Sequence, residues 1–378
     1  MRDAINRMLV GKPDSRRQLM TPALVVDLAA FRRNIATMAD HCRRQGLLLR
    51  PHAKTHKSVE IAKAQIAAGA VGICCAKLGE AEAMAEGGIG NILITSPVVT
   101  PLAIERLMAL NALIPDLHVV VDNPENGAAL AEAAAKAGRV LKVLVDLDPG
   151  LHRTGIAPGD NALALGRQLH EAPSLKLRGI QCYAGQVQHI EVFEARREAS
   201  LKAMATLGET RDAFAAAGLP VDIITGGGTG SFNIDPDARV LTELQGGSYI
   251  FMDKQYNDVK LGNAADFPFE TSLFVQMTVI SSNTPGLATT DAGFKAFSTD
   301  AEAPLLHAGA PAGAAYFFFG DEQGGIALPD GGNLAPGTVL TAFTPHCDPT
   351  VNLYDFYHVV EDDRLVAIWP IEGRGRSA

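Results

Sequence analysis

Between residues 46 and 250, short runs rich in β-branched and apolar residues alternate with longer stretches of helical periodicity. This alternation is typical of repeated βα units, in which parallel strands are joined by crossover helices. We expect eight strands, at Leu47–Lys54, Val71–Ala76, Asn91–Ser96, Leu117–Asp122, Val140–Asp146, Leu177–Tyr183, Val221–Thr225 and Thr242–Phe251. Eight such repeats predict an α/β fold, a (β/α)8 TIM-like barrel, with an open doubly wound sheet as the alternative.

The segments between these strands have the pattern of helices, and several end at Gly, where a left-handed cap is expected. The clearest of them are SVEIAKAQIAAG, LGEAEAMAEGG, NPENGAALAEAAAKAG and the stretch 190–218. In a barrel of this kind, the carboxyl ends of the strands carry the chemistry.

After about residue 265 the pattern changes to short strand-like runs separated by Gly, Pro and Asp. This sequence pattern predicts a separate, mostly-β C-terminal domain. The opening TPALVVDL is also strand-like and precedes the barrel, so we expect it to pair with that domain. The predicted domains are therefore a barrel over 30–262 and a β domain made of 1–29 and 263–378.

The composition narrows the class of protein. The chain has 378 residues and a formal net charge of −9, which disfavours binding to nucleic acid or to an anionic membrane surface. It has no apolar run of about 18 residues, and its N-terminus lacks the core of a secretory signal, so we expect a cytoplasmic protein. Five cysteines, an odd number in a large chain, indicate reduced thiols, and Cys347 lies between potential metal ligands.

Polar residues stand at the ends of the predicted strands, and Lys54 is the most informative of them. A lysine at the end of a buried strand is costly unless it is paired, neutral or covalently modified, and a Schiff-base lysine needs a depressed amine pKa. Most lysines are solvated. Here, however, the predicted strand carries Arg50, His52 and Lys54 at alternate positions, so we expect all three on one face.

Two glycine-rich segments follow the last two predicted strands, ITGGGTGSF and LQGGSYIF. The first lacks both the Lys of a P-loop and the dinucleotide-binding spacing. A nest of backbone N–H groups with the Thr229 and Ser231 hydroxyls suits a phosphate monoester. Such a loop alone is more often a turn, but two of them at the usual phosphate site of a barrel favour a phosphate cradle. A lysine beside that cradle indicates pyridoxal phosphate (PLP).

The chain resembles the fold-type III PLP enzymes, specifically the family of D-threonine aldolases, D-serine dehydratases and D-3-hydroxyaspartate aldolases, with an alanine racemase-like fold. The motifs that carry this resemblance run over nearly the whole chain: TPALVVDL, RPHAKTHKS, GICCAKLGEAEAMAEGGI, HRTG, IQCYAGQVQH, TGGGTGS, ELQGGSYIFMD, TDAGFKA, PHCDPTVNLYD and WPIEGRG.

The resemblance implies roles for individual residues in binding PLP. Lys54 is implied to bind the cofactor covalently, Arg153 to hold its phenolate oxygen ionised, and Tyr183 to lie near its ring. Gln245 falls where the related alanine racemases place an Arg against the pyridine nitrogen, and a neutral partner there is expected to leave that nitrogen unprotonated. The implied phosphate-binding residues are Gly228, Thr229, Gly247 and Ser248.

The motif TPHCDPT is a candidate metal site. On an extended segment His346 and Asp348 could reach one ion while Cys347 points away, although a His beside an Asp is more often structural. The resemblance implies a divalent metal here. The dehydratases typically have Cys as second ligand, which suits Zn²⁺, whereas Asp suits Mn²⁺, Mg²⁺ or Co²⁺. His189 resembles the family residue that takes the proton of the substrate's β-hydroxyl.

The implied activity is a retro-aldol cleavage of a small D-β-hydroxy-α-amino acid, of the D-threonine type, to glycine and an aldehyde, by a homodimer. The alternative is β-elimination, as in D-serine or D-3-hydroxyaspartate dehydratases, which Asp348 and His189 argue against. Gln323, in GDEQG, stands where relatives often have His, and it favours neither reaction.

The sequence argues against two further hypotheses, a non-catalytic PLP-binding protein and a racemase. A non-catalytic PLP-binding protein of this fold type has a single barrel domain, whereas about 110 residues follow the barrel here. A racemase would need a tyrosine as the base on the opposite face, and neither Tyr256 nor Tyr354 is placed in that role by the sequence.

Overall fold

The structure is a computed structural model that describes residues 2–259 and 268–378. The packing of the chain divides it into two compact units. The barrel unit comprises Met38–Gly247, Val259 and Gly375–Ala378, and the β unit comprises the described residues up to Thr37, Ser248–Asp258 and 268 to Arg374. The predicted domain limits, 30–262 for the barrel and 1–29 with 263–378 for the β domain, stay a prediction, because a compact unit need not fold by itself.

Eight parallel strands form the sheet of the barrel unit, in the order β2-β9-β8-β7-β6-β5-β4-β3. Their bounds are β2 Leu48–Leu49, β3 Ile73–Cys75, β4 Asn91–Ile94, β5 Asp116–Val121, β6 Leu141–Leu147, β7 Leu175–Cys182, β8 Ile223–Gly226 and β9 Glu243–Leu244. Backbone hydrogen bonds join the two ends of the sheet, from Val71 N–H to Leu49 O and from Cys74 N–H to Pro51 O, both at 2.9 Å. The predicted TIM-like barrel is confirmed.

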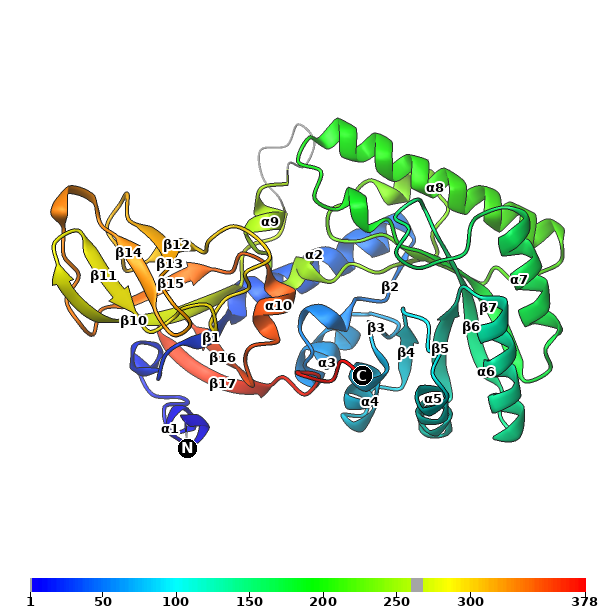
Figure 1. The fold of residues 1–378 in the computed structure, drawn as a ribbon, viewed down its shortest axis with the longest axis horizontal. Coiled ribbons are helices and arrows are strands. Elements are labelled where there is room, and N and C mark those ends of the chain that lie inside the picture. The colour runs from blue at the N-terminus through cyan, green and yellow to red at the C-terminus, as the bar shows by residue number, and fades with distance from the viewer. Residues whose placement is uncertain (1, 260–267) are drawn as a thin grey trace. The chain divides into compact units, whose positions relative to one another are not determined.

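Helices alternate with these strands along the chain, and in Figure 1 α4 to α7 lie along one side of β3 to β7. Their bounds are α2 Leu28–Gln45, α3 Val59–Ala67, α4 Leu78–Glu86, α5 Pro101–Leu113, α6 Pro124–Lys136, α7 Asp160–Glu171 and α8 Phe193–Ala216. Sequence signals set several starts: Asn123 caps α6 through bonds to the N–H groups of Glu125 and Asn126, and Pro124 occupies the first turn.

The interior of the barrel changes from apolar to polar along the strands. A buried cluster is formed by Cys74, Leu93, Val120, Leu144 and Ile223, each from a different strand or its continuation. Residues two positions further along a strand face the same side, one layer nearer the carboxyl end. In β6, β7 and β8 that next layer consists of the polar residues Asp146, Gln181 and Thr225. The strand register places Asp146 beside Gln181 and Gln181 beside Thr225.

Two predicted strands are reduced to two residues each. The first ends at Leu49 as β2, since Pro51 has no N–H to continue a ladder, and a single bridge at His52 leads into a 3-10 turn, η2 (Ala53–Thr55). The expectation that Lys54 continues the strand alternation is therefore wrong. The eighth strand is only β9, and its predicted end forms a second 3-10 turn, η5 (Ser248–Ile250).

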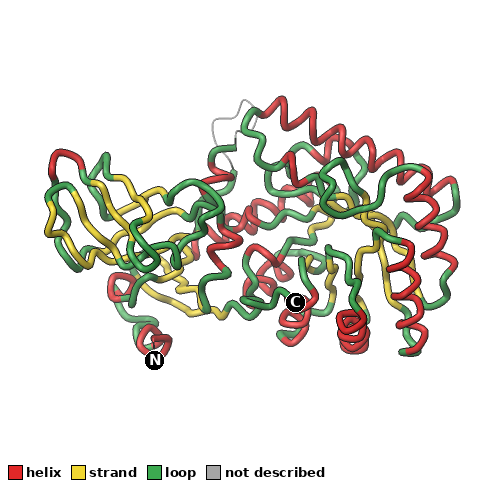
Figure 2. The backbone as a smooth tube through the Cα atoms, in the orientation of Figure 1, coloured by secondary structure: helices red, strands yellow, loops and turns green. Residues whose placement is uncertain are grey.

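The β unit contains a nine-stranded sheet, whose main path is β13-β14-β11-β10-β1-β16-β17, with β15 pairing β10 and β12. Figure 2 shows that this unit consists mainly of strands and loops. The strands are β1 Ala23–Asp27, β10 Leu273–Thr284, β11 Leu287–Thr290, β12 Leu305–Ala308, β13 Ala315–Phe318, β14 Gly324–Ala327, β15 Val339–Phe343, β16 Phe356–Glu361 and β17 Arg364–Pro370. The short helices are α1 Arg2–Arg7, α9 Lys254–Asn257 and α10 Cys347–Val351.

The N-terminal strand belongs to this sheet, as the sequence predicted. β1 pairs antiparallel with β10 and parallel with β16. Its residues Leu24, Val25 and Val26 are fully buried. The chain therefore forms a strand of the β unit before it enters the barrel.

No helix among residues 2–259 and 268–378 is both long and apolar enough to cross a membrane.

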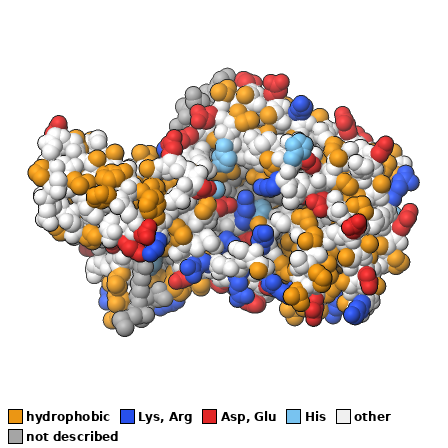
Figure 3. Space-filling view, in the orientation of Figure 1, with side chains coloured by type: hydrophobic (Ala, Val, Ile, Leu, Met, Phe, Trp, Pro, Cys, Tyr) orange, Lys and Arg blue, Asp and Glu red, His pale blue; other side chains and the backbone are white. Residues whose placement is uncertain are grey.

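On the face of the barrel unit shown in Figure 3, acidic side chains are scattered, with Lys and Arg side chains among them.

A buried ion pair stabilises the amino-terminal part of the barrel interior. The Arg50 guanidinium donates two hydrogen bonds to the Glu243 carboxylate, at 2.7 and 2.8 Å, and a third to Asn91 Oδ1 at 2.7 Å. The Arg50 and Glu243 side chains are each only 4% exposed. The positive charge of Arg50 is therefore neutralised by Glu243 inside the barrel.

We predict that Arg50→Ala lowers the free energy of unfolding by about 3–5 kcal/mol, because it leaves the Glu243 carboxylate buried without its partner. Urea denaturation followed by circular dichroism measures the loss. As a control, Arg197→Ala removes an exposed pair with Asp237 (3.0 Å) and is expected to cost no more than about 1 kcal/mol. Equal losses in the two variants would contradict the structural role of the Arg50–Glu243 pair.

Candidate active site

Lys54 lies in η2, just beyond the carboxyl end of β2, and is half-buried. Its Nζ lies 5.9 Å from the centre of the Tyr183 ring, which follows β7. The backbone N–H of Lys54 donates to Nδ1 of His52 at 3.4 Å, and Nε2 of that ring lies 3.1 Å from Thr95 Oγ1. The turn is thus attached to β4, and it directs the Lys54 amine toward an aromatic ring on the same rim.

Arg153 lies in the loop between β6 and α7, far from Lys54 in sequence but near the same aromatic ring. Its guanidinium carbon is 5.5 Å from the centre of the Tyr183 ring. The loop that carries it is held by Asp148, whose Oδ1 accepts the N–H groups of Gly150 at 2.8 Å and His152 at 3.0 Å. The structure therefore brings Lys54, Arg153 and Tyr183 together, although they are far apart in sequence.

The glycine-rich loop after β8 is buried and packs against Gln188. The Gly230 N–H donates to Gln188 Oε1 at 2.9 Å, and a Cβ on Gly228 would lie 2.4 Å from that same oxygen. Ser231 Oγ donates to Asp235 Oδ2 at 2.6 Å and accepts from Gln188 Nε2 at 3.0 Å. The Ser231 hydroxyl is therefore engaged in a buried network within the protein, and its contact with a phosphate stays a prediction.

The second glycine-rich segment approaches the turn that carries the lysine. A Cβ on Gly247 would lie 2.7 Å from Thr55 Oγ1, so only glycine fits beside η2 without displacement. Thr55 is fully buried, and its Oγ1 has no hydrogen-bond partner among the described residues. A buried hydroxyl without a partner is costly, which makes Thr55 a candidate for contact with a bound group.

Gln245 lies in the buried polar layer of the barrel, and its Nε2 donates to Gln181 Oε1 at 3.1 Å and to Thr225 Oγ1 at 3.0 Å. Gln181 in turn donates to Asp146 Oδ1 at 2.9 Å. Neither Asp146 nor Gln181 was predicted as a site residue, although Asp146 ends a predicted strand of the barrel, which was a signal for it.

His189 is exposed on the loop after β7, two residues beyond η3 (Gly185–Val187). Because the strands are parallel, β2 and β7 end on the same rim, so His189 and Lys54 belong to that rim. The neighbouring Gln188 is buried in the glycine-rich loop and fixes the backbone on which His189 stands.

The predicted metal motif lies in the β unit. His346 is extended and forms the N-cap of α10, but from Cys347 on the backbone is helical, so the predicted extended segment is wrong. The reason is local: Asp253 Oδ2 accepts the Cys347 N–H at 2.8 Å, and Pro349 fits the first turn of a helix. His346 and Asp348 are both half-buried.

Asp300 orients the imidazole of His346. Its Oδ2 lies 2.7 Å from His346 Nδ1, and Ser298 Oγ accepts the His346 N–H at 3.2 Å. No group of three or more His, Cys, Asp or Glu side chains arranged to hold a metal occurs in the described part of the chain. His346 and Asp348 therefore stay a predicted pair of ligands.

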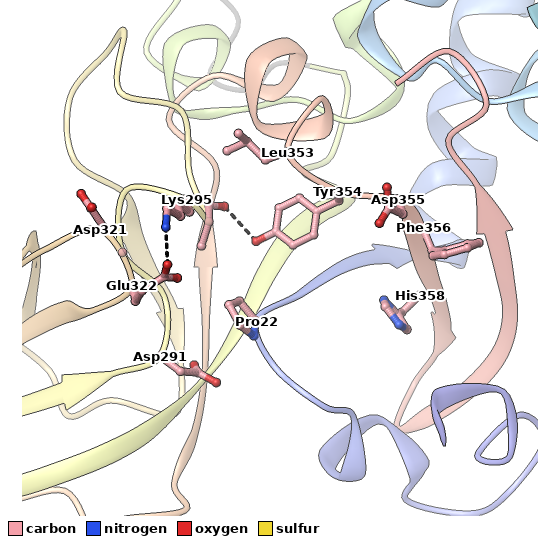
Figure 4. Close-up of a pocket in the computed structure, with 12 residues that line it drawn as sticks. Pro22, Asp291, Lys295, Asp321, Glu322, Leu353, Tyr354, Asp355, Phe356 and His358 are labelled. Carbon is pink, nitrogen blue, oxygen red and sulfur yellow. Dashed lines mark hydrogen bonds and ion pairs between the residues drawn. The ribbon is translucent and has the colours of Figure 1, made fainter. Parts of the chain in front are cut away.

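The β unit also contains a cavity of about 210 Å³, which Figure 4 shows. Lys295 forms an ion pair with Glu322 in its wall, and Tyr354 donates its hydroxyl to the Ala296 carbonyl at 2.8 Å. The Tyr354 hydroxyl, which the sequence left without a role, is thus used within the β unit.

Comparisons with known proteins agree with this architecture. The family described as "Alanine racemase, N-terminal domain" matches residues 26–255, and a "Putative serine dehydratase domain" matches 272–360. The fold and the lysine at its rim define an alanine racemase-like barrel protein. The chain belongs to the alanine racemase N-terminal domain family, with a second domain of the serine dehydratase type.

Aldolases are among the proteins that are similar to this chain over nearly its whole length. A 3-hydroxy-D-aspartate aldolase of Paracoccus denitrificans (strain Pd 1222) is 37% identical, covering 95% of this chain and 93% of its own. A D-threonine aldolase of an Arthrobacter species is 40% identical, covering 94% and 93%. The crystal structure of D-threonine aldolase from Filomicrobium marinum superposes with a TM-score of 0.91 at 37% identity, covering 95% and 97%. Dehydratases of D-threo-3-hydroxyaspartate and D-serine match at 33% and 25% identity.

We predict that the native protein does not react with a thiol reagent on a timescale of minutes. All five cysteines are reduced and buried, and burial raises the pKa of the Cys42 thiol to about 11. Titration with DTNB is expected to detect no thiol in the native state and five in denaturant. Rapid reaction at Cys347, identified by peptide mapping, would contradict its burial in α10.

Proposed function

We propose that this protein is a PLP- and divalent-metal-dependent lyase that cleaves D-β-hydroxy-α-amino acids to glycine and an aldehyde. The observation that carries the proposal is the half-buried Lys54 amine at the carboxyl rim of an alanine racemase-like barrel, beside the Tyr183 ring and the Arg153 guanidinium. The aldolase relatives, which cover at least 93% of both chains, support the reaction type.

The residues at the rim fit PLP. Lys54 supplies the amine that would bind the aldehyde of the cofactor, and Tyr183 supplies an aromatic surface beside it. Thr55 Oγ1 is a buried polar atom without a hydrogen-bond partner among the described residues, as expected of a pocket shaped for a polar ligand. Bound PLP would withdraw electrons from the bond between Cα and Cβ of an amino acid.

Each proposed side chain has a distinct task. Arg153 would keep the phenolate oxygen of the cofactor ionised through its positive charge, and Gln245 would face the ring nitrogen. Gly228, Thr229, Gly247 and Ser248 would bind the phosphate. His189, exposed on the rim, would accept the proton of the substrate's β-hydroxyl, which is the proton that leaves as the carbonyl of the aldehyde forms.

The donor set in the β unit fits a divalent metal ion. Since His346 Nδ1 contacts the Asp300 carboxylate, the proton is expected on Nδ1, which leaves Nε2 as the ligand atom. Asp348 supplies a hard carboxylate oxygen, which suits Mn²⁺, Mg²⁺ or Co²⁺ better than Zn²⁺. The metal would polarise the hydroxyl of the substrate as a Lewis acid.

β-Elimination to a 2-oxo acid and ammonia is the second candidate, because dehydratases share the fold and the second domain. Asp348 in place of a softer ligand and the base His189 favour cleavage. We also propose a homodimer that acts in the cytoplasm.

We predict that the purified protein binds PLP and releases an aldehyde from D-threonine, D-phenylserine or D-3-hydroxyaspartate, and from none of their L isomers. Lys54→Ala is expected to lose the visible absorbance of bound PLP and at least about 10³-fold in activity. Tyr316→Phe, a change in the β unit, is purified and assayed in the same way as a control, and it is expected to keep the PLP absorbance and the activity. Formation of pyruvate, 2-oxobutyrate or oxaloacetate with ammonia, in place of aldehyde and glycine, would identify a dehydratase.

We predict that EDTA abolishes the aldehyde release and that Mn²⁺ restores it. Asp300→Ala removes the partner of His346 Nδ1 and is expected to weaken Mn²⁺ binding by about 10- to 100-fold, measured by calorimetry. Asp321→Ala is a matched control on another loop of the β unit. Full activity after exhaustive chelation, with no metal found by elemental analysis, would contradict the proposed metal site.

A further inference from the structure

The buried polar layer of the barrel forms one continuous chain of side-chain hydrogen bonds. Gln181 Nε2 donates to Asp146 Oδ1 at 2.9 Å, and Gln245 Nε2 donates to Gln181 Oε1 at 3.1 Å and to Thr225 Oγ1 at 3.0 Å. Asp146, Gln181, Gln245 and Thr225 are between 0% and 4% exposed. The chain therefore runs across β6, β7 and β8 to the residue that follows β9.

The direction of this chain is set at one end by two acceptors, the Asp146 carboxylate and, at the longer distance of 3.4 Å from Gln181 Nε2, the Thr95 carbonyl oxygen. An ionised carboxylate can only accept hydrogen bonds, so the Asp146 side chain requires the NH2 group of Gln181 to face it. The carbonyl oxygen of Gln181 must then face away, toward Gln245. Gln245 can satisfy that oxygen only by turning its own NH2 group to it, and its second N–H is taken by Thr225.

The Asp146 carboxyl is ionised at mildly alkaline pH. Burial raises its pKa to about 6, while the hydrogen bonds from Gln181 and Thr154 lower it; among nearby charges, Asp122 raises the pKa and Arg153 lowers it. At pH 8 the group is therefore an acceptor only, and the orientation of both amides follows from it.

Resting on the proposed function, we propose that Asp146 and Gln181 are positioning residues that fix the Gln245 amide with its Oε1 toward the ring nitrogen of PLP. Both Nε2 hydrogens of Gln245 are engaged in the layer, so the atom it can offer to a ligand is an acceptor. An acceptor stabilises the ring nitrogen with its proton attached. The protein would thereby hold the cofactor ring in its more electron-withdrawing form, in contrast to the unprotonated nitrogen expected from the sequence.

Asp146 would thereby influence the protonation of the PLP ring nitrogen without contacting the cofactor. In Asp146→Asn the new amide can donate as well as accept, so only the longer contact with the Thr95 carbonyl oxygen, at 3.4 Å, still favours the original orientation of Gln181. Gln181 can then reverse, and Gln245 can turn its NH2 group toward the ring nitrogen. An N–H donor at that position stabilises the nitrogen without its proton. The variant keeps the shape of the side chain, so its expected effect is a change in the state of the nitrogen with little change in packing.

The test is ¹⁵N NMR at pH 8 of the holoenzyme loaded with PLP labelled at the ring nitrogen. We expect the wild-type resonance at the upfield position of a protonated nitrogen, and a downfield shift toward the unprotonated position in Asp146→Asn. The dissociation constant of PLP is expected to rise by no more than about tenfold, because only one hydrogen bond to the ring is exchanged. Asp122→Asn, which removes a carboxylate that bonds the Gly155 N–H and not Gln181, is expected to leave the resonance unshifted.

Gln181→Leu breaks the same chain at its middle and provides a second variant if Asp146→Asn does not fold. The inference is overturned if the wild-type nitrogen is unprotonated, or if both variants bind PLP and leave its resonance in place. Failure of the wild-type protein to bind PLP at all is a different result, since it would overturn the proposed function itself.

Discussion

The parallel register of the barrel strands is the constraint on which the rest of the structure depends. It places residues from different strands in layers, so that Leu144 and Ile223 share an apolar layer while Asp146, Gln181 and Thr225 share the next one. A shift of one residue in any strand would turn these side chains to the outer face. The same register brings the ends of β2 and β7 to one rim, where Lys54 meets the Tyr183 ring.

Burying the polar layer of the barrel costs free energy, which is consistent with a functional role for it. Burying a carboxylate and two amides is unfavourable unless each donor and acceptor has a partner. In this layer Gln181 and Thr154 donate to the Asp146 carboxylate, and Gln245 donates to Gln181 and Thr225. At the end of the barrel where the lysine stands, the buried Thr55 hydroxyl lacks a partner among the described residues, whereas further inside the barrel Arg50 and Glu243 satisfy each other's charge.

Much of this fold could be predicted from the sequence, because the alternation of strand and helix patterns is a local signal. β1 was also assigned to the second unit from its pattern alone. What failed was local backbone geometry: Pro51 ends the first strand before Lys54, and Asp253, about ninety residues away, supports a helix after His346. The partners of Ser231, Gln188 and Asp235, could not be predicted, because only the tertiary fold brings them to its hydroxyl. Asp300 was missed because only the tertiary fold brings it to His346.

The central claim is that the Lys54 amine carries the PLP aldehyde. Reduction of the PLP-loaded protein with borohydride, followed by digestion and mass spectrometry, tests it most directly, because it locates a covalent bond at a single atom. The account predicts one phosphopyridoxyl group per chain, on the peptide that contains Lys54. A label on another lysine, such as Lys57 or Lys77, or no label on a protein that remains folded, would contradict it.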